Sequence, residues 1–187
     1  SSVRTFVFNW LRAKSRTIIS QGSDKTLSQF NGRIAKDAWL LVNQNVSTLL
    51  PDVKKVVWNE DVSDFVVHFV ANSVGVEPIR KFDMLSDGYQ YLILMVMELS
   101  VRSILLNQHL KSKACKYAEG VVLIDEFGVH LHPELQKVIL RRLEFIFPKV
   151  QFIITTHSPM LLNGLKKEQI HILECDEEGN RSVRHPE

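Results

Sequence analysis

The spacing of apolar residues predicts two helices in the first 50 positions of the chain. Within residues 6–20, and again within residues 30–50, apolar side chains recur at the three- and four-residue intervals of one helix face. Pro51 follows the second stretch and ends it, because proline disrupts a continuing helix. The N-terminal portion is therefore expected to be helical.

Shorter apolar runs then predict strands and one long helix. Residues 56–58 and 65–70 are rich in β-branched and aromatic side chains, and the polar residues 59–61 separate them, as is typical of antiparallel strands. After the polar turn at 86–88, an apolar-rich segment continues to about Leu110 without Pro or Gly. We expect a long helix that begins at a Ser/Asp cap.

The second half of the chain alternates between strand and helix patterns. Strands are expected at 120–124, 150–155 and 169–173, and helices at 133–147 and 159–165. The first two of these strands are apolar on consecutive residues, as strands buried on two faces are. This pattern predicts a parallel sheet covered by helices, and hence an α/β fold.

Composition narrows the class of protein without indicating a partner. The chain has 187 residues, of which 45% are hydrophobic, and this is enough for a buried core. Its 23 Lys plus Arg and 21 Asp plus Glu leave a formal net charge of +2, which indicates neither strong attraction of nucleic acid nor an acidic tail. Cys115 and Cys175 lack CxxC spacing and are expected to be reduced thiols in a cytoplasmic protein.

The length of the apolar runs and the character of the N-terminus give two further expectations. The longest apolar run, 91–97, is far shorter than the roughly 20 residues that a membrane-spanning helix needs, so no membrane span is expected. The N-terminus has no initiator Met and no signal pattern, so we expect the chain to begin inside a longer protein. We divide it into a helical and strand portion at 1–84 and a C-terminal lobe at 85–187.

Two adjacent carboxylates end the strand expected at 120–124. Asp125 and Glu126 would lie at the C-terminal edge of the sheet, where open α/β sheets bind ligands. In nucleotide hydrolysis, one carboxylate can hold Mg²⁺ while the next orients or deprotonates the attacking water. The same acids can instead cap or precede a helix, and the pair alone leaves both interpretations open.

The strand expected at 150–155 ends in polar residues in the same way. Thr156, His157 and Ser158 follow it at the same edge of the sheet. An imidazole at this position can form a hydrogen bond with a terminal phosphate. The alternative is that the hydroxyls cap the next helix and His157 is merely solvated.

The turn before the long helix is a third candidate. Leu85-Ser86-Asp87-Gly88-Tyr89-Gln90 places a hydroxyl, a glycine and free backbone N–H groups at a helix N-terminus, an arrangement that binds anions such as phosphate. An ordinary capping turn has the same composition. The three segments therefore have to be interpreted together.

Their order and separation resemble those of ABC-type ATPases. Leu85-Ser86-x-Gly88-x-Gln90 looks like the signature motif, Asp125-Glu126 like the end of Walker B, and Thr156-His157-Ser158-Pro159 like the switch histidine. Together with His130-Leu131-His132-Pro133, the stretch from roughly residue 80 to 175 is similar to RecF/SMC-like AAA-type ATPases of anti-phage and retron-associated systems, including the PtuA-type ATPases of Septu defence.

This resemblance implies a fold and a partner. The fold would be a partial P-loop ATPase sheet covered by helices, formed by the C-terminal half of an ABC-type domain that uses ATP and Mg²⁺. In such families two ATPase heads, a homodimer or a head-to-head pair, enclose ATP between them. Ser86, Gly88 and Gln90 would then contact the nucleotide bound to the partner head.

The resemblance also implies roles within the head itself. Asp125 would assist Mg²⁺ through water, Glu126 would polarise the hydrolytic water, and His157 would contact the γ-phosphate. His130 and His132 would belong to the D-loop, which communicates across the dimer.

Two departures from the family pattern stand out. Phe127-Gly128 replaces an apolar residue and an acid before His-Leu-His-Pro, which bears on D-loop coupling. The larger departure is that the Walker A loop, Gly-x-x-x-x-Gly-Lys-Ser/Thr, is missing, because none of the 8 glycines is followed by Lys. The chain by itself lacks the usual cradle for the β- and γ-phosphates and is expected to bind ATP poorly.

Other interpretations remain for some of these residues. His130 and His132 could bind Zn²⁺, although Pro133 at a helix start explains the turn without metal. The acidic stretch 174–178 reads as the solvated tip of a hairpin with a Gly-Asn turn, or as a second metal site. The lysines of 111–116 could contact DNA or simply be solvated.

Two functions from different classes are compatible with the sequence. The first is an ATPase head, acting in anti-phage defence or DNA repair, that a Walker A lobe and a second protomer complete. The second is a non-catalytic interaction module that docks on a nuclease, a reverse transcriptase or another effector.

Overall fold

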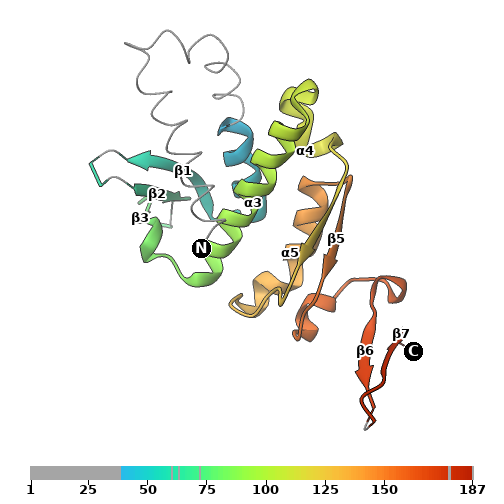
Figure 1. Cartoon of the computed structure of the whole chain (residues 1–187). Coiled ribbons are helices and arrows are strands. Elements are labelled where there is room, and N and C mark those ends of the chain that lie inside the picture. Colours follow the sequence, from blue (N-terminus) through green and yellow to red (C-terminus); the bar gives the residue numbers. More distant parts are fainter. Residues whose placement is uncertain (1–38, 60, 63, 72, 177, 187) are drawn as a thin grey trace.

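The computed structural model describes residues 39–59, 61–62, 64–71, 73–176 and 178–186 (Figure 1). The helix expected at 6–20 and the first part of that expected at 30–50 lie outside the described residues. Residues 39–49 are helical and stop before Pro51, which confirms the predicted end of the second helix. The Arg142 guanidinium donates to the carbonyl of Leu49 at 2.8 Å and so binds the end of this helix to the C-terminal half.

Three antiparallel strands follow this helix. β1 (Val53–Asn59) pairs with β2 (Asp64–Phe69), and β2 pairs with β3 (Ile79–Lys81). The first two strands confirm the antiparallel prediction. β3 was not predicted, because its residues are all exposed and it therefore carries no apolar alternation.

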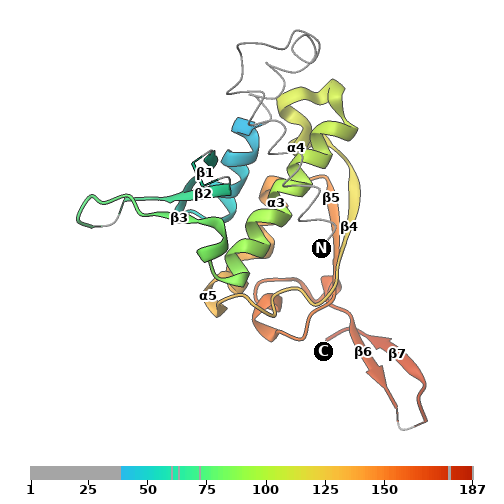
Figure 2. The same ribbon diagram turned by 60° about the vertical axis from the view of Figure 1, so that its left-hand side comes forward.

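The long helix α3 (Asp87–Leu106) crosses the centre of the molecule (Figures 1 and 2). It ends four positions earlier than predicted, and the 3-10 helix η2 (Gln108–Lys113) and α4 (Ala114–Tyr117) follow it. By length and composition alone α3 is long and apolar enough to cross a membrane, although its longest run of consecutive apolar residues is short. Its buried face packs in the core of the fold, and core helices of soluble proteins meet the same criteria.

The C-terminal half contains a parallel strand pair with a helix between its strands. β4 (Gly120–Ile124) leads to α5 (Pro133–Ile146), and β5 (Val150–Ile154) returns beside β4. The two strands pair in register, from Gly120 opposite Val150 to Ile124 opposite Ile154. Because the strands are parallel and in register, both chains leave the sheet at the same edge.

The two faces of this sheet differ, and here the expectation of strands buried on both faces is wrong. Val122, Ile124, Phe152 and Ile154 pack against the main hydrophobic cluster, which includes residues of α3 and α5. On the opposite face, Val121 is 60% exposed, Leu123 75% and Ile153 50%. Figure 1 shows both helices on one side of the strands. Consecutive apolar residues therefore marked a strand whose second face no described element covers.

The chain ends in a hairpin that projects from the body (Figures 1 and 2). Two 3-10 helices, η3 (Pro159–Leu162) and η4 (Lys167–Gln169), lead to β6 (Ile172–Cys175) and β7 (Arg181–Arg184), which are antiparallel. The strand thus starts later than the predicted 169–173. The Asp176 carboxylate accepts backbone N–H bonds from Glu178 at 3.0 Å and Asn180 at 2.7 Å, which confirms the predicted turn.

Ile93 and Leu106 of α3 make a matched test of this core. Ile93 is fully buried, whereas Leu106 is 79% exposed. We expect Ile93→Ala to lower the free energy of unfolding by about 2–5 kcal/mol, because it removes buried contacts and leaves a cavity. Leu106→Ala should change it by less than about 0.5 kcal/mol. Urea denaturation followed by circular dichroism measures both, and equal losses would contradict the burial assigned to α3.

Candidate functional site

The two acidic residues that follow β4 lie beside the residues that follow β5, as the parallel sheet requires. The Thr155 hydroxyl donates a hydrogen bond to the Asp125 carboxylate, and the same oxygen accepts the Glu126 backbone N–H at 2.9 Å. One threonine thus orients one acid and anchors the backbone of the other. Thr155 was not predicted as a site residue, because a hydroxyl at a strand end carries no distinctive spacing.

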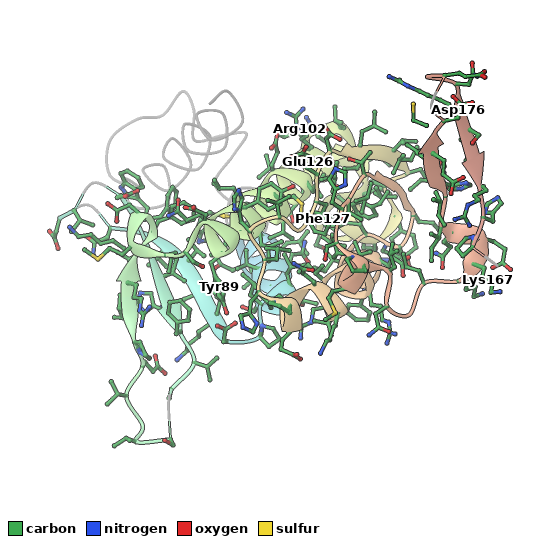
Figure 3. All side chains as sticks on the ribbon, turned by 90° about the horizontal axis from the view of Figure 1, so that it is seen from below. Tyr89, Arg102, Glu126, Phe127, Lys167 and Asp176 are labelled. Atoms are coloured by element: carbon green, nitrogen blue, oxygen red, sulfur yellow. The ribbon has the colours of Figure 1, made fainter. Side chains whose placement is uncertain are left out.

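Glu126 has an unusual backbone conformation. Its φ is 51°, in the left-handed region, which costs a non-glycine residue roughly 1–2 kcal/mol. The next residue, Phe127, is buried, donates its N–H to the Thr155 carbonyl at 2.9 Å and accepts from the Thr156 hydroxyl at 2.8 Å. Glu126 and Phe127 are labelled in Figure 3. The surrounding hydrogen bonds hold the strained turn, and both carboxylates are exposed at this edge.

The segment after β5 is tied to α5 and the loop before it. The Ser158 N–H donates to the Thr156 hydroxyl at 3.0 Å, and the Ser158 hydroxyl donates to the Gln136 side-chain carbonyl. The amide of Gln136 donates in turn to the carbonyls of Gly128 at 2.9 Å and Leu131 at 2.8 Å. Ser158 stands at the start of η3 without capping it through its side chain.

His157 lies exposed between these tethered residues, at the same edge of the sheet as Asp125 and Glu126. Its neighbours Thr156 and Ser158 are held by the hydrogen bonds just described, so the backbone on both sides of the imidazole is fixed. The structure therefore brings together three of the residues that the sequence analysis singled out.

The histidines of the loop after Glu126 have different surroundings. His132 is the N-cap of α5, its Nδ1 accepting the Glu134 N–H at 3.4 Å, and Pro133 is the first helical residue. His130 is exposed. In the part of the chain that the structure describes, no group of three or more His, Cys, Asp or Glu side chains could hold a metal ion. The arrangement agrees with the helix start that Pro133 predicted.

Ser86 occupies the N-cap position of α3, but its side chain makes no capping hydrogen bond. Its hydroxyl is therefore not used in the way that an ordinary capping turn would use it. Gln90 is used locally, because its amide donates to the carbonyl of Leu85 at 2.9 Å and reaches that of Asp83 at 3.4 Å. Gln90 thus fastens the turn in front of the helix.

A cavity of about 420 Å³ opens beside Ser86, between the antiparallel sheet and the start of α3. Its wall includes Asp52, Arg80 and Tyr89, and the Tyr89 hydroxyl donates to the Asp52 carboxylate at 2.5 Å. Burial, with this hydrogen bond, raises the pKa of Tyr89, so the phenol stays protonated. Arg80 lies over the Phe69 ring of the same wall, 5.8 Å from its centroid.

Asp125 and Glu126 line a separate, smaller cavity of about 80 Å³, together with Tyr91 and residues 128–131. Ser86 and the two acids of one chain therefore face different cavities. Gly88 comes close to the loop after Glu126, because a Cβ on it would be 2.4 Å from the His130 carbonyl oxygen. The start of α3 and the loop after Glu126 pack backbone against backbone, which only glycine permits.

Comparisons with known proteins show the family of this chain. Residues 14–163 match the protein family described as "AAA domain, putative AbiEii toxin, Type IV TA system". The chain belongs to this AAA domain family. The family match spans most of the chain, from the N-terminal portion to the residues after β5.

Curated relatives of this AAA domain include a probable ATPase of a retron and a Septu protein. The chain is 44% identical over 89 residues to the retron Vc95 probable ATPase of Vibrio cholerae, a match that covers 48% of this chain and 17% of that protein. It is 41% identical over 99 residues to the Septu protein PtuA of Bacillus mycoides, covering 52% of this chain and 13% of that protein. The chain thus spans a small part of the relatives that it matches.

Solved structures with the same fold are SMC heads. One, from work titled "Structural biochemistry of ATP-driven dimerization and DNA stimulated activation of SMC ATPases", has a TM-score of 0.57 at 13% identity and covers 81% of this chain and 84% of that one. An Smc head bound to the C-winged helix domain of ScpA has a TM-score of 0.59 at 14% identity, over 97% of this chain and 53% of that one. The predicted partial ATPase-head fold of the α/β class is confirmed.

The contact of Gly88 with the His130 carbonyl can be tested through stability. In a helix, Gly→Ala usually stabilises by about 1 kcal/mol. We expect the opposite for Gly88→Ala, a loss of about 1–3 kcal/mol in the free energy of unfolding, because the new methyl group forces the two backbones apart. Gly120→Ala is the control, since its Cβ would meet nothing within 4 Å. A stabilised Gly88→Ala would show that the contact does not exist.

Proposed function

We propose that this chain is the C-terminal part of an ATP-binding and ATP-hydrolysing ABC-type head. The observation that carries the proposal is the edge of the parallel sheet, where Thr155 links Asp125 and Glu126 and where His157 is exposed. In this assignment Glu126 orients or deprotonates the attacking water, and His157 contacts the terminal phosphate. Membership of an AAA domain family supports the use of a nucleotide.

The same edge suits a magnesium nucleotide. Carboxylate and hydroxyl oxygens, as supplied by Asp125 and Thr155, are the ligands that Mg²⁺ accepts directly or through water. When bound, the ion would neutralise phosphate charge. Thr155 keeps the Asp125 carboxylate aimed along the sheet edge and leaves Glu126 exposed for its own task. Asp125 is therefore proposed to assist Mg²⁺ through water.

Ser86, Gly88 and Gln90 are proposed to serve the nucleotide of a second head. Two observations support action in trans: Ser86 and the acids of one chain line different cavities, and the Ser86 hydroxyl is not used as a cap. In this proposal Gln90 acts through the backbone turn that it fastens. His130 and His132 would form the D-loop, in which the His130 carbonyl lies against Gly88. The active unit would be a homodimer or a head-to-head pair.

A further lobe has to complete each head. No glycine of this sequence is followed by Lys, so a Walker A loop would come from elsewhere in the protein. The exposed apolar face of β4 and β5 supports this idea, because parallel sheets are normally covered on both faces. Within this scheme the division into residues 1–84 and 85–187 remains our proposal.

The biological setting belongs to the same proposal. Similarity to the retron and Septu proteins favours a cytoplasmic role in anti-phage defence, with a nuclease or another effector as partner. We also propose that the protein contacts DNA; this proposal is supported only by the similarity to SMC heads. If the protein instead acts as a non-catalytic docking module, it will not hydrolyse ATP in its full length.

Glu126→Gln in the full-length protein tests the assignment of the catalytic acid. The amide cannot accept a proton from water, so we expect ATP turnover to fall by about 100-fold or more while ATP binding persists. Steady-state phosphate release and binding of a fluorescent nucleotide measure the two properties. Glu144→Gln, an exposed acid on α5, is the matched control and should keep wild-type turnover. Equal turnover in the two variants would remove Glu126 from the proposed role.

The chain of 187 residues by itself should show no appreciable ATP hydrolysis, because it lacks the phosphate cradle of the Walker A loop. Phosphate release by the purified chain, with and without Mg²⁺, measures this. The control is the full-length protein, purified and assayed in the same way, which should hydrolyse ATP. Robust Mg²⁺-dependent turnover by the short chain, abolished by Glu126→Gln, would contradict the need for a second lobe.

A further inference from the structure

One face of α3 touches the loop that carries the candidate catalytic acid. Gly88 and Tyr91 are three positions apart and so lie on the same side of the helix. Gly88 packs against the His130 carbonyl, as described above. Tyr91 contacts the Phe127 ring, with ring centroids 6.1 Å apart and planes at 50°. The first turns of α3 therefore meet the loop after Asp125 at two points, the Phe127 ring and the His130 carbonyl.

The contact with Phe127 falls next to the most strained backbone of the site. Glu126, with its positive φ, directly precedes Phe127. A left-handed conformation at a glutamate persists only where its surroundings hold it. Thr155 and Thr156 supply hydrogen bonds to this turn from the sheet side, and Tyr91 covers the Phe127 ring from the helix side.

Tyr91 also shares a cavity with the acids Asp125 and Glu126. Its side chain lines the same small cavity as Asp125 and Glu126, and it is 40% exposed, so it forms part of the wall of that cavity rather than of the core. Partial burial raises the pKa of the Tyr91 phenol, which therefore stays neutral near pH 7. The side chain thus contributes an uncharged ring beside two carboxylates.

We infer that Tyr91 is a positioning residue for Glu126. Its ring packs on Phe127 and thereby holds the left-handed turn that presents the Glu126 carboxylate. The inference rests on the proposed ATPase function and adds a residue outside the signature, Walker B and switch segments. It also makes α3 serve two sites: its N-terminus meets the nucleotide of the second head, and Tyr91 supports the acid of its own head.

Tyr91→Ala and Tyr91→Phe in the full-length protein separate positioning from other roles. Tyr91→Ala should lower kcat for ATP hydrolysis about 10- to 100-fold, because a small displacement of the Glu126 carboxylate slows the chemical step by about this factor. KM should stay within about twofold of the wild-type value. Tyr91→Phe keeps the ring and should keep most of the wild-type kcat. Tyr117→Ala, an exposed tyrosine outside both cavities, is the control and should match the wild type.

The outcomes decide between distinct explanations. Wild-type kcat in Tyr91→Ala, or an equal loss in Tyr91→Phe, overturns the inference, since the ring would then not be what positions Glu126. A loss of kcat that is matched by lost nucleotide binding and a lowered unfolding midpoint indicates a structural role only and also overturns it. If Tyr91→Ala does not fold, Tyr91→Leu takes its place with the same expectations. If the wild-type full-length protein does not hydrolyse ATP, the proposed function itself is wrong.

Discussion

The parallel, in-register pairing of β4 and β5 is the constraint on which the candidate site depends. Because Ile124 lies opposite Ile154, the residues after both strands leave the sheet at one edge. Thr155 then lies close enough to bind the Asp125 carboxylate and the Glu126 backbone at once. A shift of one residue between the strands would turn the side chains to the opposite faces and break both hydrogen bonds. The register of the two strands therefore fixes how Thr155, Asp125 and Glu126 lie relative to one another.

α3 extends this constraint to the rest of the fold. Its buried face belongs to the same hydrophobic cluster as the helical residues 39–49, the antiparallel strands and α5. Its N-terminus packs on the loop after β4 through Gly88, and Tyr91 contacts Phe127 one turn later. Phe127 is buried, and its backbone N–H bond to the Thr155 carbonyl anchors the turn. Phe127 thus supplies packing directly after the strained Glu126.

The apolar surface is distributed unevenly over the parallel strand pair. One face of the β4–β5 sheet is packed on α3 and α5, and the other leaves Val121, Leu123 and Ile153 exposed. The hairpin β6–β7, with Asp176 at its tip, projects well away from Glu126 (Figure 3). Apolar strands buried on one face only are uncommon in parallel sheets, so this face is the natural place for a further lobe.

Apolar periodicity and short motifs are local properties, so the element types, the α/β class and the likeness to ATPase heads could be predicted from the sequence alone. The sequence also placed Asp125, Glu126 and His157 at one sheet edge, since parallel strands share their C-terminal ends. Only the tertiary structure revealed the role of Thr155, the left-handed Glu126, the Gly88 contact and the Tyr91–Phe127 pair. These depend on which residues from distant segments meet, and a one-dimensional pattern does not contain that information. The open face of the sheet escaped prediction for the same reason, because an apolar strand looks alike whether one face or both are covered.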